Sequence, residues 1–305
     1  MSTRLVIVGL FLAVTAAVLV PGFRAPAADH QLRQLTEAEI EQLREVLPER
    51  ATARPQRPRK LLIFWRCEGF FHGDAILWSN KAFEMIGEKT GAYTSVASTD
   101  MAMFEPENLN RFDAVFFNNT SALKFENEAH RKALLDFVHG GKGIVGSHAA
   151  TDNFYQWPEG AAMMGALFAG HPWYEAPVKL DDPTHPLVRV FEGRGFWFRD
   201  EMYRFRDPYS RDRLRVLLSF DMSKLPADAP NREDGDNAIA WIQQVGEGRV
   251  FYCSLGHDGR IFRDPRILQF YLDGIQYALG DLEADATPSA KLDPQPKPAL
   301  PPEKP

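Results

Sequence analysis

Short apolar runs alternate with helical patterns between Lys60 and Ser147, and this alternation restricts the chain to few folds. Helices are expected over 75–91 and 126–141, between apolar runs over 60–65, 92–98, 113–119 and 142–147. Strands that are apolar on both faces need cover on both faces. The pattern therefore predicts an α/β fold with a mainly parallel central sheet and helices on both sides.

The second half of the chain reads mostly as strands. They are expected over 176–180, 197–205, 213–220, 238–244 and 248–256, and a closing helix over 265–280. Gly246 and Gly248 mark a hairpin turn between the last two strands. Hairpins join antiparallel neighbours, so we expect antiparallel strands added to the parallel sheet.

Both ends of the chain differ from this central region, which we place at residues 60–280. Residues 1–27 combine Arg4, an apolar run over 5–20 and Ala-Pro-Ala at the end. This pattern predicts a signal peptide and export to the periplasm or the outside. The alternative is an uncleaved N-terminal membrane anchor, although the run is shorter than the roughly 20 residues of a spanning helix.

Two flanking segments complete the domain plan. Residues 28–59 are expected to hold a short helix over 36–47, begun by a capping box of Thr36 and Glu39, and then a basic linker. Residues 281–305 are rich in proline and charge and poor in large apolar side chains. Such a composition predicts a disordered tail.

Charge and cysteine content exclude some function classes. The chain has 35 Lys and Arg against 41 Asp and Glu, a net charge of −6. An acidic protein of this kind is not expected to bind nucleic acid or, after cleavage of the signal peptide, an anionic membrane. Cys67 and Cys253 are the only cysteines. They form either one disulfide or two buried thiols, and the sequence leaves that choice open.

Polar residues gather where the predicted strands end. Ligands of open parallel sheets bind outside the carboxyl ends of the strands. These ends carry Arg66, Cys67, Glu68 and His72; Asn118 and Asn119; Ser147, His148 and Asp152; and Gly256, His257 and Asp258.

His148 lies in the stretch GGKGIVGSHAATDNF (140–154), directly after a strand. Gly146 before it and two alanines after it predict a sharp bend with an exposed histidine, as in a nucleophile elbow. The alternative is a structural histidine bonded to the backbone. His257 holds a similar position after the last strand, whereas a functional and a structural role are equally open for His72 and His171.

The stretch RDEMY (199–203) adds a carboxylate to these histidines. On a strand, Glu201 and Tyr203 share one face and Asp200 points to the other. The stretch follows an aromatic run over 196–198. Carboxylates beside aromatic faces suit a sugar, while the alternative is ordinary core packing.

Five stretches in this order resemble the ThuA-like (trehalose-utilisation) family over about residues 61–279. They are GGKGIVGSHAATDNF, MGALFAGHPW, DPTHPLV, FRDEMYRF and GEGRVFYCSLGHDG. The resemblance implies a flavodoxin-like sandwich of the class I glutamine amidotransferase-like type. Amidotransferases carry a cysteine nucleophile at the bend, where this chain has His148. The resemblance therefore implies an enzyme that is not an amidotransferase.

The same resemblance implies a role in the use of trehalose or related disaccharides through 3-keto sugars made by a partner oxidoreductase. A C3 ketone acidifies the C2 proton, so His148 or Glu201 would act as the base and His257 as the acid toward the leaving group. Substrate-binding residues would be His72, Asn118, Asp152, His171 and Tyr203.

Two alternatives stay open. In the first, His148, His171, Glu201 and His257, with His72 as a substitute for His171, hold Zn²⁺ or a similar ion in a metal-dependent hydrolase or lyase. In the second, the protein binds carbohydrate without catalysis.

Overall fold

A computed structural model describes residues 30–304 of the protein, so the predicted signal peptide lies outside the described residues. The predicted N-terminal helix is confirmed as α1 (Glu37–Val46), with Thr36 and Glu39 bonded reciprocally in a capping box. Among residues 30–304, no helix has both the length and the apolar character needed to cross a membrane.

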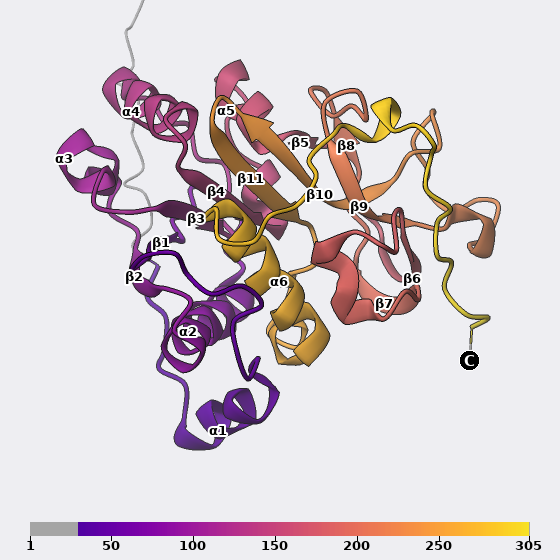
Figure 1. Ribbon diagram of the computed structural model, residues 1–305, viewed down its shortest axis with the longest axis horizontal. Helices are drawn as coiled ribbons and strands as arrows, with labels where there is room; N and C mark the ends of the chain where they lie inside the picture. The colour runs from indigo at the N-terminus through magenta and orange to yellow at the C-terminus, as the bar shows by residue number, and fades with distance from the viewer. Residues whose placement is uncertain (1–29, 305) are drawn as a thin grey trace, which may run out of the picture.

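One nine-stranded sheet forms the centre of the molecule (Figure 1). Its order is β2-β1-β3-β4-β11-β10-β9-β6-β7, parallel from β2 to β11 and antiparallel beyond. The predicted α/β fold with added antiparallel strands is thereby confirmed. The strands are β1 (Lys60–Phe64), β2 (Thr94–Ser98), β3 (Ala114–Asn118), β4 (Gly143–Ser147), β6 (Trp173–Leu180), β7 (Phe196–Glu201), β9 (Arg215–Phe220), β10 (Ala238–Val245) and β11 (Gly248–Cys253), and β5 (Leu167–Phe168) pairs separately with β8 (Phe205–Arg206).

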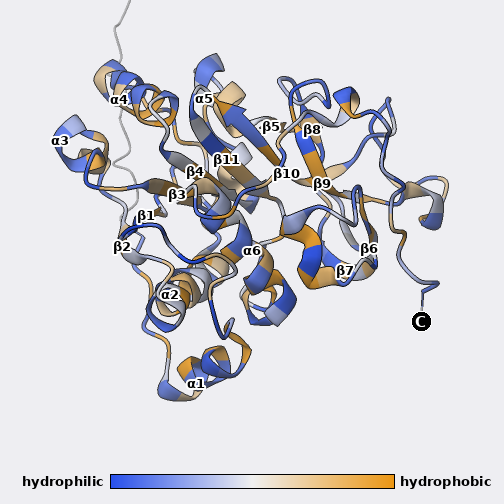
Figure 2. Ribbon diagram, viewed as in Figure 1, coloured by the Kyte–Doolittle hydropathy of each residue, from blue (hydrophilic) through white to orange (hydrophobic). Residues whose placement is uncertain are grey.

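Helices cover both faces of the parallel part, as Figures 1 and 2 show. Successive strand side chains point to opposite faces. In β1, Leu61 and Ile63 enter one buried cluster, and Leu62 and Phe64 enter the other. The first cluster is closed by α2 (Gly73–Thr90) and α6 (Pro265–Ala278), the second by α3 (Pro106–Leu109), α4 (Glu128–His139) and α5 (Pro158–Met164).

The C-terminal segment differs from the expected disordered tail. Residues 281–304 run across the antiparallel half of the molecule (Figure 1). Leu180 and Ala299 exchange two backbone hydrogen bonds of 3.0 Å, and Ser289 Oγ accepts one from Val216 N at 2.9 Å. The segment is therefore held in part by backbone and small polar groups, a contribution that a count of large apolar side chains does not reveal.

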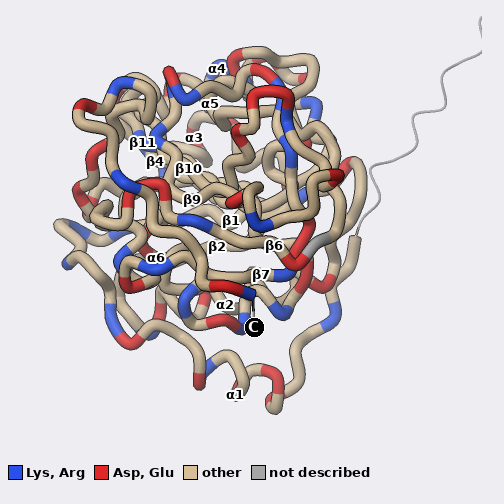
Figure 3. The backbone as a smooth tube through the Cα atoms, turned by 90° about the vertical axis from the view of Figure 1, so that its right-hand side faces the viewer, with Lys and Arg blue, Asp and Glu red and all other residues tan. Residues whose placement is uncertain are grey.

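Cysteines and charges complete the description. Cys67 and Cys253 are both buried free thiols. In Figure 3, acidic and basic residues are interspersed along the chain.

Candidate functional site

Four segments that are distant in sequence converge on one cluster of side chains. His72 precedes α2, His148 follows β4, Glu201 is the last residue of β7, and His257 follows β11. One possible ligand atom from each of these four residues lies within 4.8 Å of the others. Register explains part of this convergence, because Ser147 pairs with Asn118 on β3 and with Cys253 on β11. The carboxyl ends of β3, β4 and β11 are therefore level with one another.

His148 occupies a strained bend, as its sequence context predicts. Its φ of 45° lies in the left-handed region, which non-glycine residues rarely adopt. β11 and the residues after it hold this bend: His148 Nδ1 donates to Ser254 O at 2.7 Å, and Tyr252 Oη donates to His148 O at 2.7 Å. Because a carbonyl can only accept, Nδ1 carries the proton and Nε2 of neutral His148 has a free lone pair.

The expectation that His148 is exposed is wrong, since its exposed fraction is 0%. Rings from other segments pack around it, with centroids 4.2 Å away in Tyr203, 4.8 Å in His72 and 5.4 Å in His257. The small residues beside His148 in sequence leave space at the bend, and these distant rings fill it.

The carboxylate of Glu201 contacts imidazoles without forming hydrogen bonds to them. Its Oε2 lies 3.3 Å from His148 Nε2, and its Oε1 lies 3.0 Å from His257 Nδ1. Both nitrogens, and Nδ1 of His72, are buried atoms with no partner in hydrogen-bonding geometry among the described residues. Buried polar atoms normally have such partners. Nitrogen and oxygen atoms arranged in this way match the ligands of Zn²⁺ and similar ions.

Electrostatics favour the ligating forms of Glu201 and His72. They favour the protonated form of His257, because burial lowers its pKa but the contact with Glu201 outweighs burial and raises it. Burial raises the pKa of Glu201, but the contacts with His148 and His257 outweigh it and hold the pKa well below its usual range. Burial, together with the neighbouring His148 and His257, lowers the pKa of His72 to about 2. At neutral pH Glu201 is therefore an anion and His72 a neutral imidazole, the states that bind cations.

Solvent reaches the cluster from one side. Side-chain exposure rises from 0% at His148 and 9% at Glu201 to 25% at His257 and 35% at His171. His171 Nε2 lies 3.4 Å from Glu201 Oε1, but His171 is outside the cluster of four. His72 thus takes the inner position that was predicted for His171, and His171 lies on the open side.

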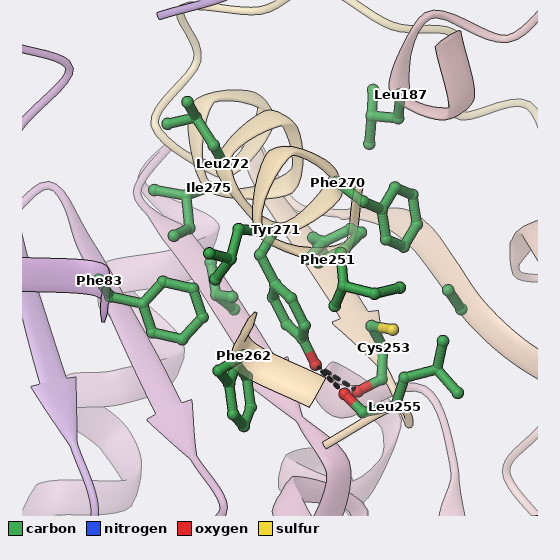
Figure 4. Close-up of a cluster of buried hydrophobic side chains, with 14 of the residues drawn as sticks. Phe83, Leu187, Phe251, Cys253, Leu255, Phe262, Phe270, Tyr271, Leu272 and Ile275 are labelled. Atoms are coloured by element: carbon green, nitrogen blue, oxygen red, sulfur yellow. Dashed lines mark hydrogen bonds between the residues drawn. The ribbon is translucent and has the colours of Figure 1, made fainter. Parts of the chain in front are cut away.

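Asp200 supports the cluster in a way that the sequence does not reveal. Its Oδ1 accepts from Glu201 N at 2.8 Å, and its Oδ2 accepts from Gly256 N at 2.9 Å. Burial raises the pKa of this carboxyl to about 6. Tyr271 of α6 holds the same segment, since its Oη donates to Leu255 O at 2.7 Å (Figure 4). The backbone before His257 is therefore fixed from two directions.

The other predicted substrate-binding residues lie in different environments. The Asn118 amide is buried and bonded to Ser79, Asn80 and Ser147. Asp152 is half-buried and accepts from the hydroxyl of Tyr155, while Tyr203 packs against His148. Their roles toward a substrate remain predictions. Phe70, an exposed aromatic beside the cluster, was missed because two adjacent phenylalanines in a loop do not reveal which ring is exposed.

Comparison with known proteins matches the chain to one family and its fold. The family model for ThuA, described as trehalose utilisation, matches residues 60–278. A solved ThuA-like protein from Bacteroides uniformis shares 24% identity over 74% of this chain and 93% of its own, with a TM-score of 0.60. A ThuA-like protein from Parabacteroides merdae shares 18% over 75% and 93%, with a TM-score of 0.55. Identities this low show the fold alone, and no curated protein matches the sequence.

Proposed function

Because the chain belongs to the ThuA (trehalose utilisation) family, we propose that it is a metal-dependent lyase or hydrolase acting on an oxidised glycoside. A 3-keto derivative of trehalose is the substrate that this proposal favours. The observation that supports the metal is the set of three buried imidazole nitrogens without hydrogen bonds around the carboxylate of Glu201.

The donor set fits a divalent ion of the first transition row. Imidazole nitrogens of His72, His148 and His257 with one carboxylate oxygen of Glu201 suit Zn²⁺ or a neighbouring metal. The geometry also argues against His148 as a direct acid or base. A side chain with no exposed surface cannot touch a substrate, whereas a metal ligand needs no such access.

The proposed reaction is an elimination next to a ketone. A divalent ion at the cluster would polarise the C3 carbonyl of the sugar and so acidify the C2 proton. His171, on the open side of the cluster, accepts that proton. The electron pair of the C2–H bond forms the C1–C2 double bond, and the C1–O bond breaks with its pair on the leaving oxygen. That oxygen takes up a proton from water, His171 returns its proton to the solvent, and the released sugar is glucose with the former linking oxygen as its anomeric hydroxyl.

The proposal also covers the source of the substrate and the cellular location of the reaction. The substrate must be supplied by an oxidoreductase that converts the C3 hydroxyl of a glycoside into a ketone. The proposal puts this chemistry in the periplasm or outside the cell, which the signal-peptide pattern of residues 1–27 supports.

The test is turnover of 3-keto-trehalose by protein stripped with a chelator and reloaded with Zn²⁺, Mn²⁺ or Co²⁺. We expect glucose release only from the reloaded protein, and none from Glu201→Gln. Glu175→Gln serves as the matched control, because Glu175 is an exposed carboxylate on the adjacent strand β6. Full turnover after chelation would favour catalysis by the side chains alone. Substrate that persists with every metal would favour a carbohydrate-binding protein.

A further inference from the structure

Among the described side chains of residues 30–304, Phe70 is the large apolar one with the greatest exposure, at 66%. It lies in the loop between β1 and α2, two positions before His72. Single exposed apolar residues are common on protein surfaces. Phe70 differs from such residues in its position and in how firmly its backbone is held.

Its ring lies beside two members of the cluster, His72 and His257. The Phe70 ring centroid lies 4.7 Å from that of His72 and 6.5 Å from that of His257, with an angle of 22° to the His257 ring. Trp173 contacts His257 as well, at 5.1 Å between centroids. Two aromatic rings therefore border the part of the cluster that solvent reaches.

The backbone on either side of Phe70 is fixed by one neighbour. Glu68 N and Gly69 N donate to Ser121 O at 2.8 and 3.2 Å, and Ser121 Oγ donates to Phe70 O at 2.6 Å. A Cβ on Gly69 would lie 2.8 Å from Ala122 Cβ, which is closer than real contacts allow. The fold thus holds the Phe70 ring at the surface.

Phe71, the next residue, is also a phenylalanine but is less exposed than Phe70. Phe71 is half-buried, and its ring stacks on His30 with centroids 4.0 Å apart and an angle of 2°. Of two adjacent phenylalanines, one is covered by the protein's own chain and the other is left open next to the cluster.

We propose that Phe70 is a substrate-positioning residue whose ring stacks on the apolar C–H face of a pyranose. Aromatic faces carry partial negative charge that attracts C–H groups, and binding sites pair apolar surfaces with a few polar groups. The assignment of the sugar's reacting end to the cluster rests on the proposed function. The stacking contact itself needs only the position of the ring.

The experiment measures the dissociation constant of methyl α-glucopyranoside, which lacks the C3 ketone and so cannot undergo the elimination, on Zn²⁺-loaded protein, together with KM and kcat for 3-keto-trehalose. Phe70→Ala should raise both the dissociation constant and KM on the order of 10-fold, with kcat nearly unchanged. Phe70→Tyr keeps the aromatic face and should stay within about twofold of the wild type. Zinc stoichiometry and the unfolding temperature should not change in either variant, because the side chain is exposed.

The outcomes separate this inference from the proposed function. If Phe70→Ala binds the sugar as tightly as the wild type, or if the wild type binds no pyranoside, the positioning role is overturned. If turnover survives chelation while Phe70→Ala still raises KM, the metal mechanism fails and the stacking role stands.

Discussion

One largely buried carboxylate, Asp113, lies at the amino ends of the parallel strands, which we call the amino edge. Another, Glu201 at the end of β7, lies level with their carboxyl ends, which we call the carboxyl edge. The surroundings of these two groups differ. At the amino edge, just before β3, Asp113 accepts hydrogen bonds from Arg57 Nη2 at 2.6 Å, Lys60 N at 2.9 Å and Lys142 Nζ at 3.1 Å. At the carboxyl edge, Glu201 faces imidazole nitrogens that form no hydrogen bond to it.

We interpret this difference as that between a structural charge, Asp113, and the charge that the proposed function assigns to cation binding, Glu201. A buried charge with complete hydrogen bonding contributes to stability, whereas a buried charge without it is costly. The amino edge meets the first condition with the protein's own groups. At the carboxyl edge, burial raises the pKa of Glu201, but the neighbouring imidazoles of His148 and His257 stabilise the anion and hold the pKa well below its usual range. Their nitrogens without hydrogen-bond partners are the groups that the proposed function assigns to a cation.

The largest expected effect is the loss of metal binding at the carboxyl edge. His148→Gln removes one ligand nitrogen and should weaken Zn²⁺ binding by roughly 100-fold or more. Asp113→Asn, at the opposite edge, should leave the zinc dissociation constant unchanged. Calorimetric titration of both stripped variants checks this. Equal zinc affinity in His148→Gln and the wild type would show that His148 is not a metal ligand and would contradict the proposed metal site.

A smaller effect is expected at Asp200, which positions the cluster without being a member of it. Asp200→Asn keeps the shape but places an amide N–H group opposite a backbone donor, Glu201 N or Gly256 N. We expect zinc affinity to fall by about 10-fold to 100-fold, as for other residues that orient metal ligands. Retained zinc stoichiometry at high metal concentration would distinguish this role from that of a ligand. Unchanged affinity would show that Asp200 does not position the cluster.

At the amino edge the expected effect is on stability. Burial raises the pKa of Asp113, but Lys60 N and Arg57 outweigh it, so the pKa is lowered from 3.8. A lowered native pKa means that the stabilisation is fully present well above 3.8 and is lost as the pH falls through the native value. Asp113→Asn should therefore reduce the free energy of unfolding by about 1–3 kcal/mol at pH 7 and by less at pH 3. Urea titrations at both pH values measure this, and an equal loss at both would contradict the charge-based account.

The smallest effect belongs to the exposed partner of the same group. The Arg57 side chain is 54% exposed, so water screens its ion pair with Asp113. Arg57→Ala should cost less than about 1 kcal/mol, because Lys142 and Lys60 N still serve the carboxylate. A loss of unfolding free energy as large as that of Asp113→Asn would show that Arg57 alone provides the stabilising contact to the Asp113 carboxylate.

The sequence was sufficient to predict the sheet and the edge at which the site forms. Apolar runs and strand ends are local patterns, and they placed His148 and His257 at one edge. Glu201, which was expected inside a strand, was assigned from the stretch RDEMY and from the family resemblance, and it lies with both histidines. The sequence could not decide whether His72 or His171 joins the cluster, because both lie in loops whose paths depend on distant contacts. The burial of His148 has the same cause, since its ring neighbours come from other segments.

Two other features depend on backbone groups, which sequence patterns represent poorly. Asp200 accepts from two backbone amides, one of them 56 residues away. Residues 281–304 are attached through backbone bonds such as those between Leu180 and Ala299. Apolar periodicity reports side-chain burial, and neither of these contacts contributes to it.

Anomalous diffraction from crystals of the zinc-loaded protein tests the central claim most directly. We predict one strong anomalous peak per chain between His72, His148, Glu201 and His257, and no such peak in crystals of Glu201→Gln. A peak only at surface residues, or the same peak in both proteins, would contradict the account.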